Sequence, residues 1–133
     1  MTGKEIKIVT FNKNFKYDLE FGEIREQRVA DILLNQKIEV KTERGQWAST
    51  GNIAIEYEYK GRPSGITTTE APYWLHVLEV DGEEFCTLLF KTSVLRGLLD
   101  TVKSSRKVAG GDDNQSKLVL LPLSELFKAA KRR

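Results

Sequence analysis

The sequence predicts a mixed α/β domain. Runs in which apolar residues alternate, as in strands, come between runs in which they recur at helical spacing. The chain has 133 residues and 40% of them are hydrophobic, which fits a single domain over residues 1–133 with one core. An Asp-Gly pair at residues 81–82 lies between two strand-like runs and predicts a β-hairpin. We therefore expect a central mixed β-sheet flanked by helices.

Each element has its own local signal. Alternation and β-branched residues predict the strands. Helical spacing predicts the helices, with Asp18, Ser93 and Ser124 as N-caps. The predicted strands are residues 5–11, 37–43, 52–60, 75–80, 83–90 and 117–123, and the predicted helices are residues 18–34, 93–102 and 124–133, with a short helix beginning within residues 67–74. The Gly- and Asp-rich run at about residues 104–117 predicts a flexible loop.

Composition narrows the classes of function. A net charge of +2 does not by itself indicate nucleic-acid binding. One cysteine, Cys86, excludes a disulfide framework, and its apolar surroundings predict a buried, inert thiol. No run approaches the ~20 apolar residues of a membrane span, and the N-terminal residues lack the apolar centre of a signal peptide. We expect a soluble, cytoplasmic protein.

Charged residues on one predicted strand point to a possible site. Residues two apart on a strand share a face, so Glu39 and Lys41 point the same way. If the next strand folds back antiparallel, a register that puts Lys41 opposite Ala54 also puts Glu39 opposite Glu56. Glu58 would extend this polar patch, whereas a one-residue slip would turn Glu56 away.

Such a patch has two interpretations. Carboxylates a few ångströms apart repel unless a cation lies between them or one keeps its proton. Oxygen ligands without His or Cys suit Mg²⁺ or Mn²⁺, and a nearby lysine positions water or neutralises charge on a phosphate. This combination suits hydrolysis of a phosphodiester. The alternative is a solvated cross-strand charge pair, because Glu-x-Lys tripeptides are common.

Neighbouring motifs favour the first interpretation through resemblance. Together they resemble the PD-(D/E)XK nuclease superfamily, above all its small phage-type and Holliday-junction-resolving members. There a helix with a G-x-x-x-E pattern, matched by Gly22 and Glu26, precedes a strand with (D/E)-x-K, matched by Glu39 and Lys41. The motifs are G-E-I-R-E-Q-R-V, I-E-V-K-T-E, W-x-x-T-G-N-I-x-I-E, P-S-G-I and T-E-A-x-Y-W, within roughly residues 18–78.

The resemblance implies a fold, an activity and a set of site residues. It implies a restriction-endonuclease-like core and an Mg²⁺- or Mn²⁺-dependent DNA endonuclease, in the host cytoplasm if the protein is viral. Glu26, Glu39 and Glu56 would hold the metal together with the Val40 carbonyl. Lys41 would orient the attacking water.

One departure from the family pattern leaves open which acid completes the metal site. The family acid before (D/E)-x-K is often an Asp that follows a proline, and no Pro-Asp pair occurs here. Asp31 supplies it if the helix has ended by that point. We favour Glu56, from the next strand, as the acid that supplies the missing metal ligand. In a third variant Glu39 is the first acid, Glu56 and Glu58 form the second motif, and Lys41 is accessory.

DNA contacts and partners complete the prediction. Trp47 could stack on a base, and the cations could contact phosphates or could equally be solvated. We expect the single histidine, His76, to be structural. The chain is expected to be a homodimer that resolves branched DNA, since family members cut two strands with paired sites. A sequence-specific or homing-type phage endonuclease is one alternative, and a non-catalytic nucleic-acid-binding or interaction domain is another. The predicted DNA-binding residues are Arg44, Trp47, Thr50, Asn52, Lys60, Arg62 and Ser64.

Overall fold

The structure is a computed structural model that describes residues 15–102 and 106–130. The chain divides into two units, Met1–Gln36 and Lys37–Arg133, and each is described by itself. The single domain that the sequence predicts over residues 1–133 stays a prediction.

The described part of the first unit is one long helix. This helix, α1, runs from Phe15 to Asn35 and confirms the helix predicted at residues 18–34. Apolar and charged residues alternate around it, and the Arg25 guanidinium lies 4.9 Å from the centre of the Phe21 ring. The strand predicted at residues 5–11 lies outside the described residues.

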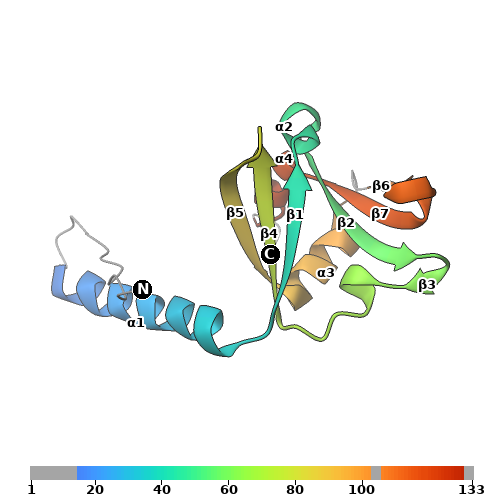
Figure 1. The fold of residues 1–133 in the computed structure, drawn as a ribbon. Coiled ribbons are helices and arrows are strands. Elements are labelled where there is room, and N and C mark those ends of the chain that lie inside the picture. The colour runs from blue at the N-terminus through green and yellow to red at the C-terminus, as the bar shows by residue number, and fades with distance from the viewer. Residues whose placement is uncertain (1–14, 103–105, 131–133) are drawn as a thin grey trace. The chain divides into compact units, whose positions relative to one another are not determined.

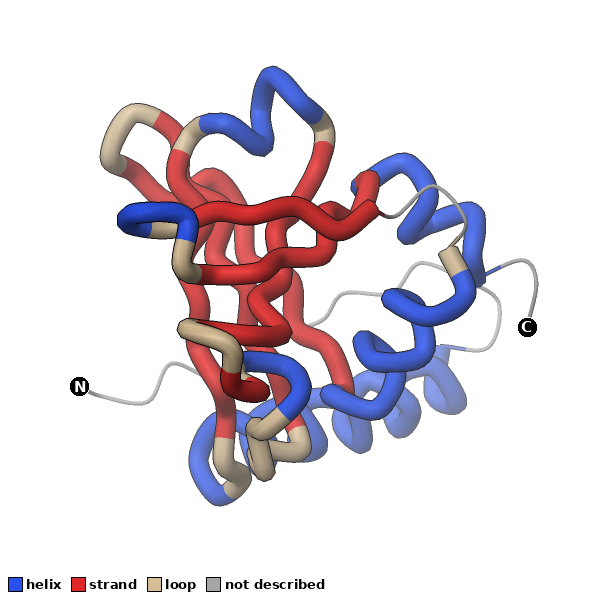
Figure 2. The backbone as a smooth tube through the Cα atoms, turned by 90° about the vertical axis from the view of Figure 1, so that its right-hand side faces the viewer, coloured by secondary structure: helices blue, strands red, loops and turns tan. Residues whose placement is uncertain are grey.

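The second unit carries the strands and three α-helices (Figures 1 and 2). Its elements are β1 (Ile38–Arg44), α2 (Gln46–Thr50), β2 (Asn52–Tyr59), β3 (Arg62–Pro63), η1 (Gly65–Thr67), β4 (Tyr73–Val80), β5 (Glu83–Lys91), α3 (Thr92–Thr101), β6 (Arg106–Gly110), η2 (Asp112–Asn114), β7 (Ser116–Pro122) and α4 (Leu123–Ala129).

The strands form two sheets. Sheet A has the order β1-β4-β5, with β1 parallel to β4 and β4 antiparallel to β5. Sheet B has the order β3-β2-β7-β6, and its pairs are antiparallel. The mixed α/β class predicted from the sequence is therefore confirmed, with a mixed sheet and flanking helices (Figure 2).

The hairpin predicted at residues 81–82 is also confirmed. β4 and β5 pair antiparallel on either side of it. Asp81 has φ 53° and Gly82 has φ 81°, the left-handed pair that a type I′ turn requires. This turn places β5 at the edge of sheet A.

Several local expectations were wrong. Much of the predicted loop is ordered backbone, because Arg106–Gly110 pairs with β7 and Asp112–Asn114 forms a 3-10 turn. The helix expected within residues 67–74 is replaced by the earlier turn η1 and by β4 from Tyr73. The three predicted N-caps were also wrong, because Asp18 lies inside α1 and the N-caps of α3 and α4 are Lys91 and Pro122, not Ser93 and Ser124. Cys86, expected to be buried, is exposed on the edge strand β5.

The core lies where the inner faces of the two sheets meet α3 and α4. Trp74, Ile53, Ile55, Leu95 and Leu121 are its largest fully buried apolar side chains. Fully burying an aliphatic or aromatic side chain contributes about 1.5–3 kcal/mol, so these five fix the packing of both sheets. In the part of the chain that the structure describes, no helix has the length and apolarity to cross a membrane.

Candidate functional site

Strand β1 carries the predicted charged face. Glu39 and Lys41 are half-buried, whereas Val40 between them is 55% exposed and lies on the opposite face. The predicted common face of Glu39 and Lys41 is therefore confirmed. Their partners in β4 are Trp74 and His76, so this charged face turns toward the core side of sheet A.

The predicted partner of that strand was wrong. β1 pairs with β4, and β2 pairs with β3 and β7, so Glu39 and Glu56 do not face each other across a ladder. The short helix α2 lies between β1 and β2 and redirects the chain from one sheet to the other (Figure 1). The predicted patch of Glu39, Lys41 and Glu56 on paired strands is therefore not formed, and the side chains that do lie together are described next.

A cavity of about 510 Å³ between the two sheets brings Lys41 and Glu56 together. Glu43 and His76 also line it, and Glu39 does not. Glu43 is the acid that the sequence analysis missed, although the alternation that pairs Glu39 with Lys41 also puts Glu43 on the same face. The full lining is Lys41, Thr42, Glu43, Arg44, Ala54, Glu56, Trp74, His76, Gly111 and Leu118.

Two serine hydroxyls hold the carboxylate of Glu56. Ser116 Oγ donates to its Oε1 at 2.8 Å, and Ser64 Oγ donates to its Oε2 at 3.1 Å. Gly65 and Gly111 have positive φ and let the chain come close at these two contacts. The predicted DNA-binding residue Ser64 thus contacts a candidate catalytic acid.

Glu43 belongs to a polar chain that joins the two sheets. Trp74 Nε1 donates to His76 Nδ1 at 3.1 Å, and His76 Nε2 lies 3.1 Å from Glu43 Oε1. Because an indole nitrogen only donates, His76 Nδ1 accepts, and its proton is on Nε2 toward Glu43. The same Glu43 oxygen accepts the backbone N–H of Ala54. His76 is 1% exposed, which agrees with the structural role expected for it.

Lys41 differs from the acids around it. Its ammonium lies 5.9 Å from the centre of the Trp74 ring, and within residues 15–102 and 106–130 it forms no ion pair. Desolvated cation–π contacts are worth about 2 kcal/mol, and exposed ones about 0.5–1 kcal/mol. The ring therefore holds the ammonium beside the cavity while leaving its donors for an anion.

Two of the acids predicted as metal ligands, Glu26 and Asp31, lie in α1 of the first unit. Asp31 lies inside α1, and its carboxylate accepts from Asn35 Nδ2 at 2.8 Å. The alternative in which the helix has ended before Asp31 was therefore wrong. Glu26 also lies in α1, and its role as a metal ligand stays a prediction. Glu58 does not extend the patch, because it pairs with Lys117 Nζ at 2.8 Å, which raises the pKa of Lys117.

The predicted DNA-binding residues other than Ser64 divide into three groups. Trp47 was wrongly expected to stack on a base, because it is buried and its Nε1 donates to the Glu79 carbonyl at 2.9 Å. The Thr50 hydroxyl donates to the Gln46 carbonyl and accepts the Asn52 N–H, so these two residues stabilise the end of α2. The cations Arg44, Lys60 and Arg62 are exposed.

The donor set of the cavity fits magnesium in a limited way. The described residues hold no group of three or more His, Cys, Asp or Glu side chains arranged for a metal. Mg²⁺ keeps several waters and needs only one or two carboxylates, and Glu43 and Glu56 are the two acids that line the cavity. Glu39 and the Val40 backbone lie on β1 outside the cavity lining, so their predicted role as ligands stays a prediction.

Comparison with known proteins adds no family. No protein-family model, curated protein or solved structure matches the chain.

Proposed function

We propose that the protein is a metal-dependent DNA endonuclease whose active site is the cavity between sheets A and B. One observation carries the proposal. Lys41, an ammonium without an ion-pair partner among the described residues, opens into the same 510 Å³ space as the carboxylates of Glu43 and Glu56. A lysine beside two hard-oxygen acids suits the hydrolysis of a phosphodiester.

The side chains of the cavity have distinct roles in this proposal. Mg²⁺ or Mn²⁺ held by Glu43 and Glu56 would neutralise charge on the phosphate. Lys41 positions the attacking water and stabilises the developing negative charge. The hydroxyls of Ser64 and Ser116 fix the Glu56 carboxylate, so its orientation is set before substrate binds.

Exposed cations supply the attraction for DNA. Arg44 lines the cavity itself, and Lys60 and Arg62 are exposed at the turn from β2 to β3. Phosphate contacts of this kind position a duplex without reading its sequence. Branched DNA is the preferred substrate, and linear sites cut by a sequence-specific or homing-type enzyme are the alternative.

A second function is favoured by the bonding of the two acids. Both Glu56 oxygens accept hydroxyl bonds, and one Glu43 oxygen accepts from His76 and Ala54. These bonds also suit a domain that binds DNA without cutting it, in which Glu43 serves only to join the two sheets and Glu56 only to hold Ser64 and Ser116. The two functions differ in whether Mg²⁺ produces cleavage.

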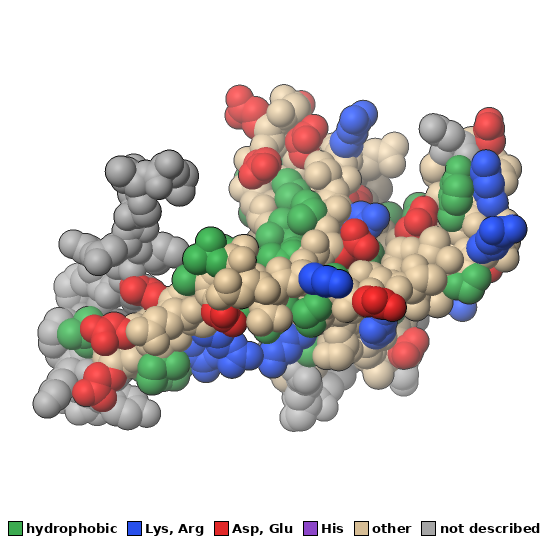
Figure 3. Space-filling view, turned by 60° about the horizontal axis from the view of Figure 1, so that its bottom comes forward, with side chains coloured by type: hydrophobic (Ala, Val, Ile, Leu, Met, Phe, Trp, Pro, Cys, Tyr) green, Lys and Arg blue, Asp and Glu red, His purple; other side chains and the backbone are tan. Residues whose placement is uncertain are grey.

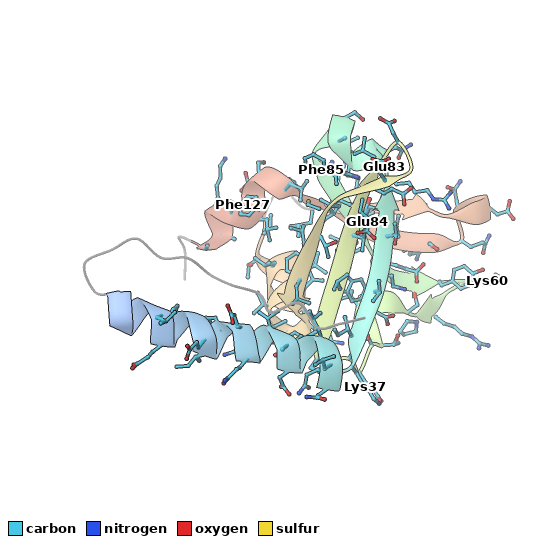
Figure 4. The ribbon with its side chains drawn as sticks, turned by 60° about the vertical axis from the view of Figure 1, so that its left-hand side comes forward. Lys37, Lys60, Glu83, Glu84, Phe85 and Phe127 are labelled. Carbon is cyan, nitrogen blue, oxygen red and sulfur yellow. The ribbon has the colours of Figure 1, made fainter. Side chains whose placement is uncertain are left out.

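The test is a cleavage panel of linear, supercoiled, flapped and four-way DNA with Mg²⁺, Mn²⁺ or EDTA. The parent should cut at least one substrate with metal and none with EDTA. Lys41→Ala and Glu43→Gln should lose cleavage by about 100-fold or more while still binding DNA. Lys37→Ala, an exposed lysine four residues earlier, should cut like the parent (Figure 4).

Two results would count against the nuclease. If Lys41→Ala cuts DNA as well as Lys37→Ala does, the cavity is not the active site. Metal-independent DNA binding by the parent, with no cleavage of any substrate, would support the non-catalytic function instead.

A further inference from the structure

Strand β5 presents an open edge of sheet A. It is nine residues long, Glu83–Lys91, and within the described residues it pairs only with β4. Most of its residues are exposed, including Phe85 at 71% and Leu89 at 40%. An exposed strand edge offers a row of backbone donors and acceptors that another strand satisfies.

The other edges of the two sheets are less suited to a partner. At the opposite edge of sheet A, Glu43 of β1 reaches the backbone N–H of Ala54 in β2. Sheet B has two edge strands. β3 is only two residues long, and β6 is only five residues long and begins with two cations, Arg106 and Lys107, with no acid to match them. Among these edge strands, β5 is therefore the one that is long, open and carries both acidic and basic residues.

The sequence of β5 is complementary to itself in the antiparallel direction. Glu83 and Glu84 lie at its first end, next to the hairpin turn (Figure 4), and Lys91 lies at its last end. Full overlap of two such strands puts their two-fold axis at the midpoint, Thr87. Each acidic end then meets the partner's lysine, and Phe85 lies opposite Leu89.

A β-bulge changes this register by one residue at most. The pairing of β5 with β4 shifts between Cys86 and Glu84, so either Glu83 or Glu84 lies opposite the lysine. Opposite charges facing each other across strands stabilise a pair, and like charges destabilise it. The parallel direction would instead set the acids of both strands side by side.

The outward face of sheet A continues this interface. Val40, Leu75 and Leu89 lie on that face by register, opposite to the core. Val40 and Leu89 are among the exposed apolar side chains, and apolar side chains gather over the strands in Figure 3. A sheet extended across two chains would make this apolar surface continuous.

We propose that a second copy of this chain pairs with it through β5, antiparallel about Thr87, and joins the two A sheets into one six-stranded sheet. Stable protein–protein interfaces bury about 1,200 Å² or more of surface, and we expect one pair of nine-residue strands to bury less than that. The fraction of dimer should therefore depend on protein concentration in the micromolar range. The dimer does not depend on the proposed nuclease activity, because its test measures the mass of the particle and the formation of a disulfide between two chains.

The first arm of the test measures the mass of the full chain by analytical ultracentrifugation from 1 to 500 µM. We expect a shift from one chain to two. Lys91→Glu should weaken the dimer about ten-fold or more, because two symmetry-related pairs change from attraction to repulsion. Adding Glu83→Lys and Glu84→Lys to the same chain should restore it, and circular dichroism checks that each variant is folded.

The second arm measures the register by disulfide formation in a Cys86→Ser background. Thr87→Cys places two thiols directly opposite, where Cα atoms lie 4.5–5.5 Å apart, within the range for a disulfide. Thr42→Cys, exposed on the other edge strand β1, is the matched control. A monomer at all concentrations, an unchanged dimer with Lys91→Glu, or equal cross-linking of the two cysteine variants would each overturn the proposal.

Discussion

Gly65 lies against the backbone of the candidate catalytic acid Glu56. Its φ is +52°, and a Cβ added there would overlap the Glu56 carbonyl oxygen and lie 2.9 Å from its carbonyl carbon. An L-residue with such a φ costs about 1–2 kcal/mol. Because β2 is held in sheet B by its pairing with β7, the overlap adds about 1–3 kcal/mol. Gly65→Ala should therefore lower the free energy of unfolding by about 2–5 kcal/mol.

Two other glycines separate these contributions. Gly82 has φ +81° and nothing within 4 Å of an added Cβ, so Gly82→Ala measures the backbone cost alone. Gly97 lies inside α3 with an ordinary φ and open space, so Gly97→Ala should gain about 0.5–1 kcal/mol. Urea denaturation of the four proteins gives the comparison. A Gly65→Ala variant no less stable than Gly82→Ala would refute the contact with Glu56.

Two further predictions concern polar pairs. His76→Phe should cost about 1–3 kcal/mol in urea denaturation, because it leaves the buried Trp74 N–H without its acceptor and removes a donor from Glu43; an unchanged stability would contradict the polar chain. Glu58→Gln should return the pKa of Lys117 toward 10.5, because the Glu58 hydrogen bond and charge raise it, as NMR titration of the lysine would show. The raised pKa means that the pair stabilises the fold below pH 10.5 and that this contribution is lost as the pH rises through the pKa of Lys117.

The sequence predicted best what is decided locally. The turn at Asp81 and Gly82 depends on two residues that adopt positive φ, and the shared face of Glu39 and Lys41 depends on strand alternation. Both rules act within a few residues, so no knowledge of distant contacts is needed. The helix around residues 18–34 was found for the same reason.

Features set by distant contacts were missed. β1 pairs with β4 because α2 lies between β1 and β2, and α2 is anchored by the bond from Trp47 to the Glu79 carbonyl, 32 residues away. The polar neighbours of Trp47 gave no sign that its ring is buried. Likewise, the apolar neighbours of Cys86 did not show that β5 is an edge strand, since that depends on strand order.

The identity of residue 43 bears on whether the cavity is more than structural. Its Oε1 accepts from both Ala54 and His76, and a glutamine oxygen would accept these same two bonds. A carboxylate is therefore not required to join the sheets, and placing one where the side chain is 15% exposed costs desolvation unless a cation is near. Lys41 and Arg44 are the side-chain cations that line the same cavity, and a bound divalent ion would be a further one. Glu43→Gln, which keeps the polar chain and removes the charge, is for this reason the variant that separates a structural acid from a catalytic one.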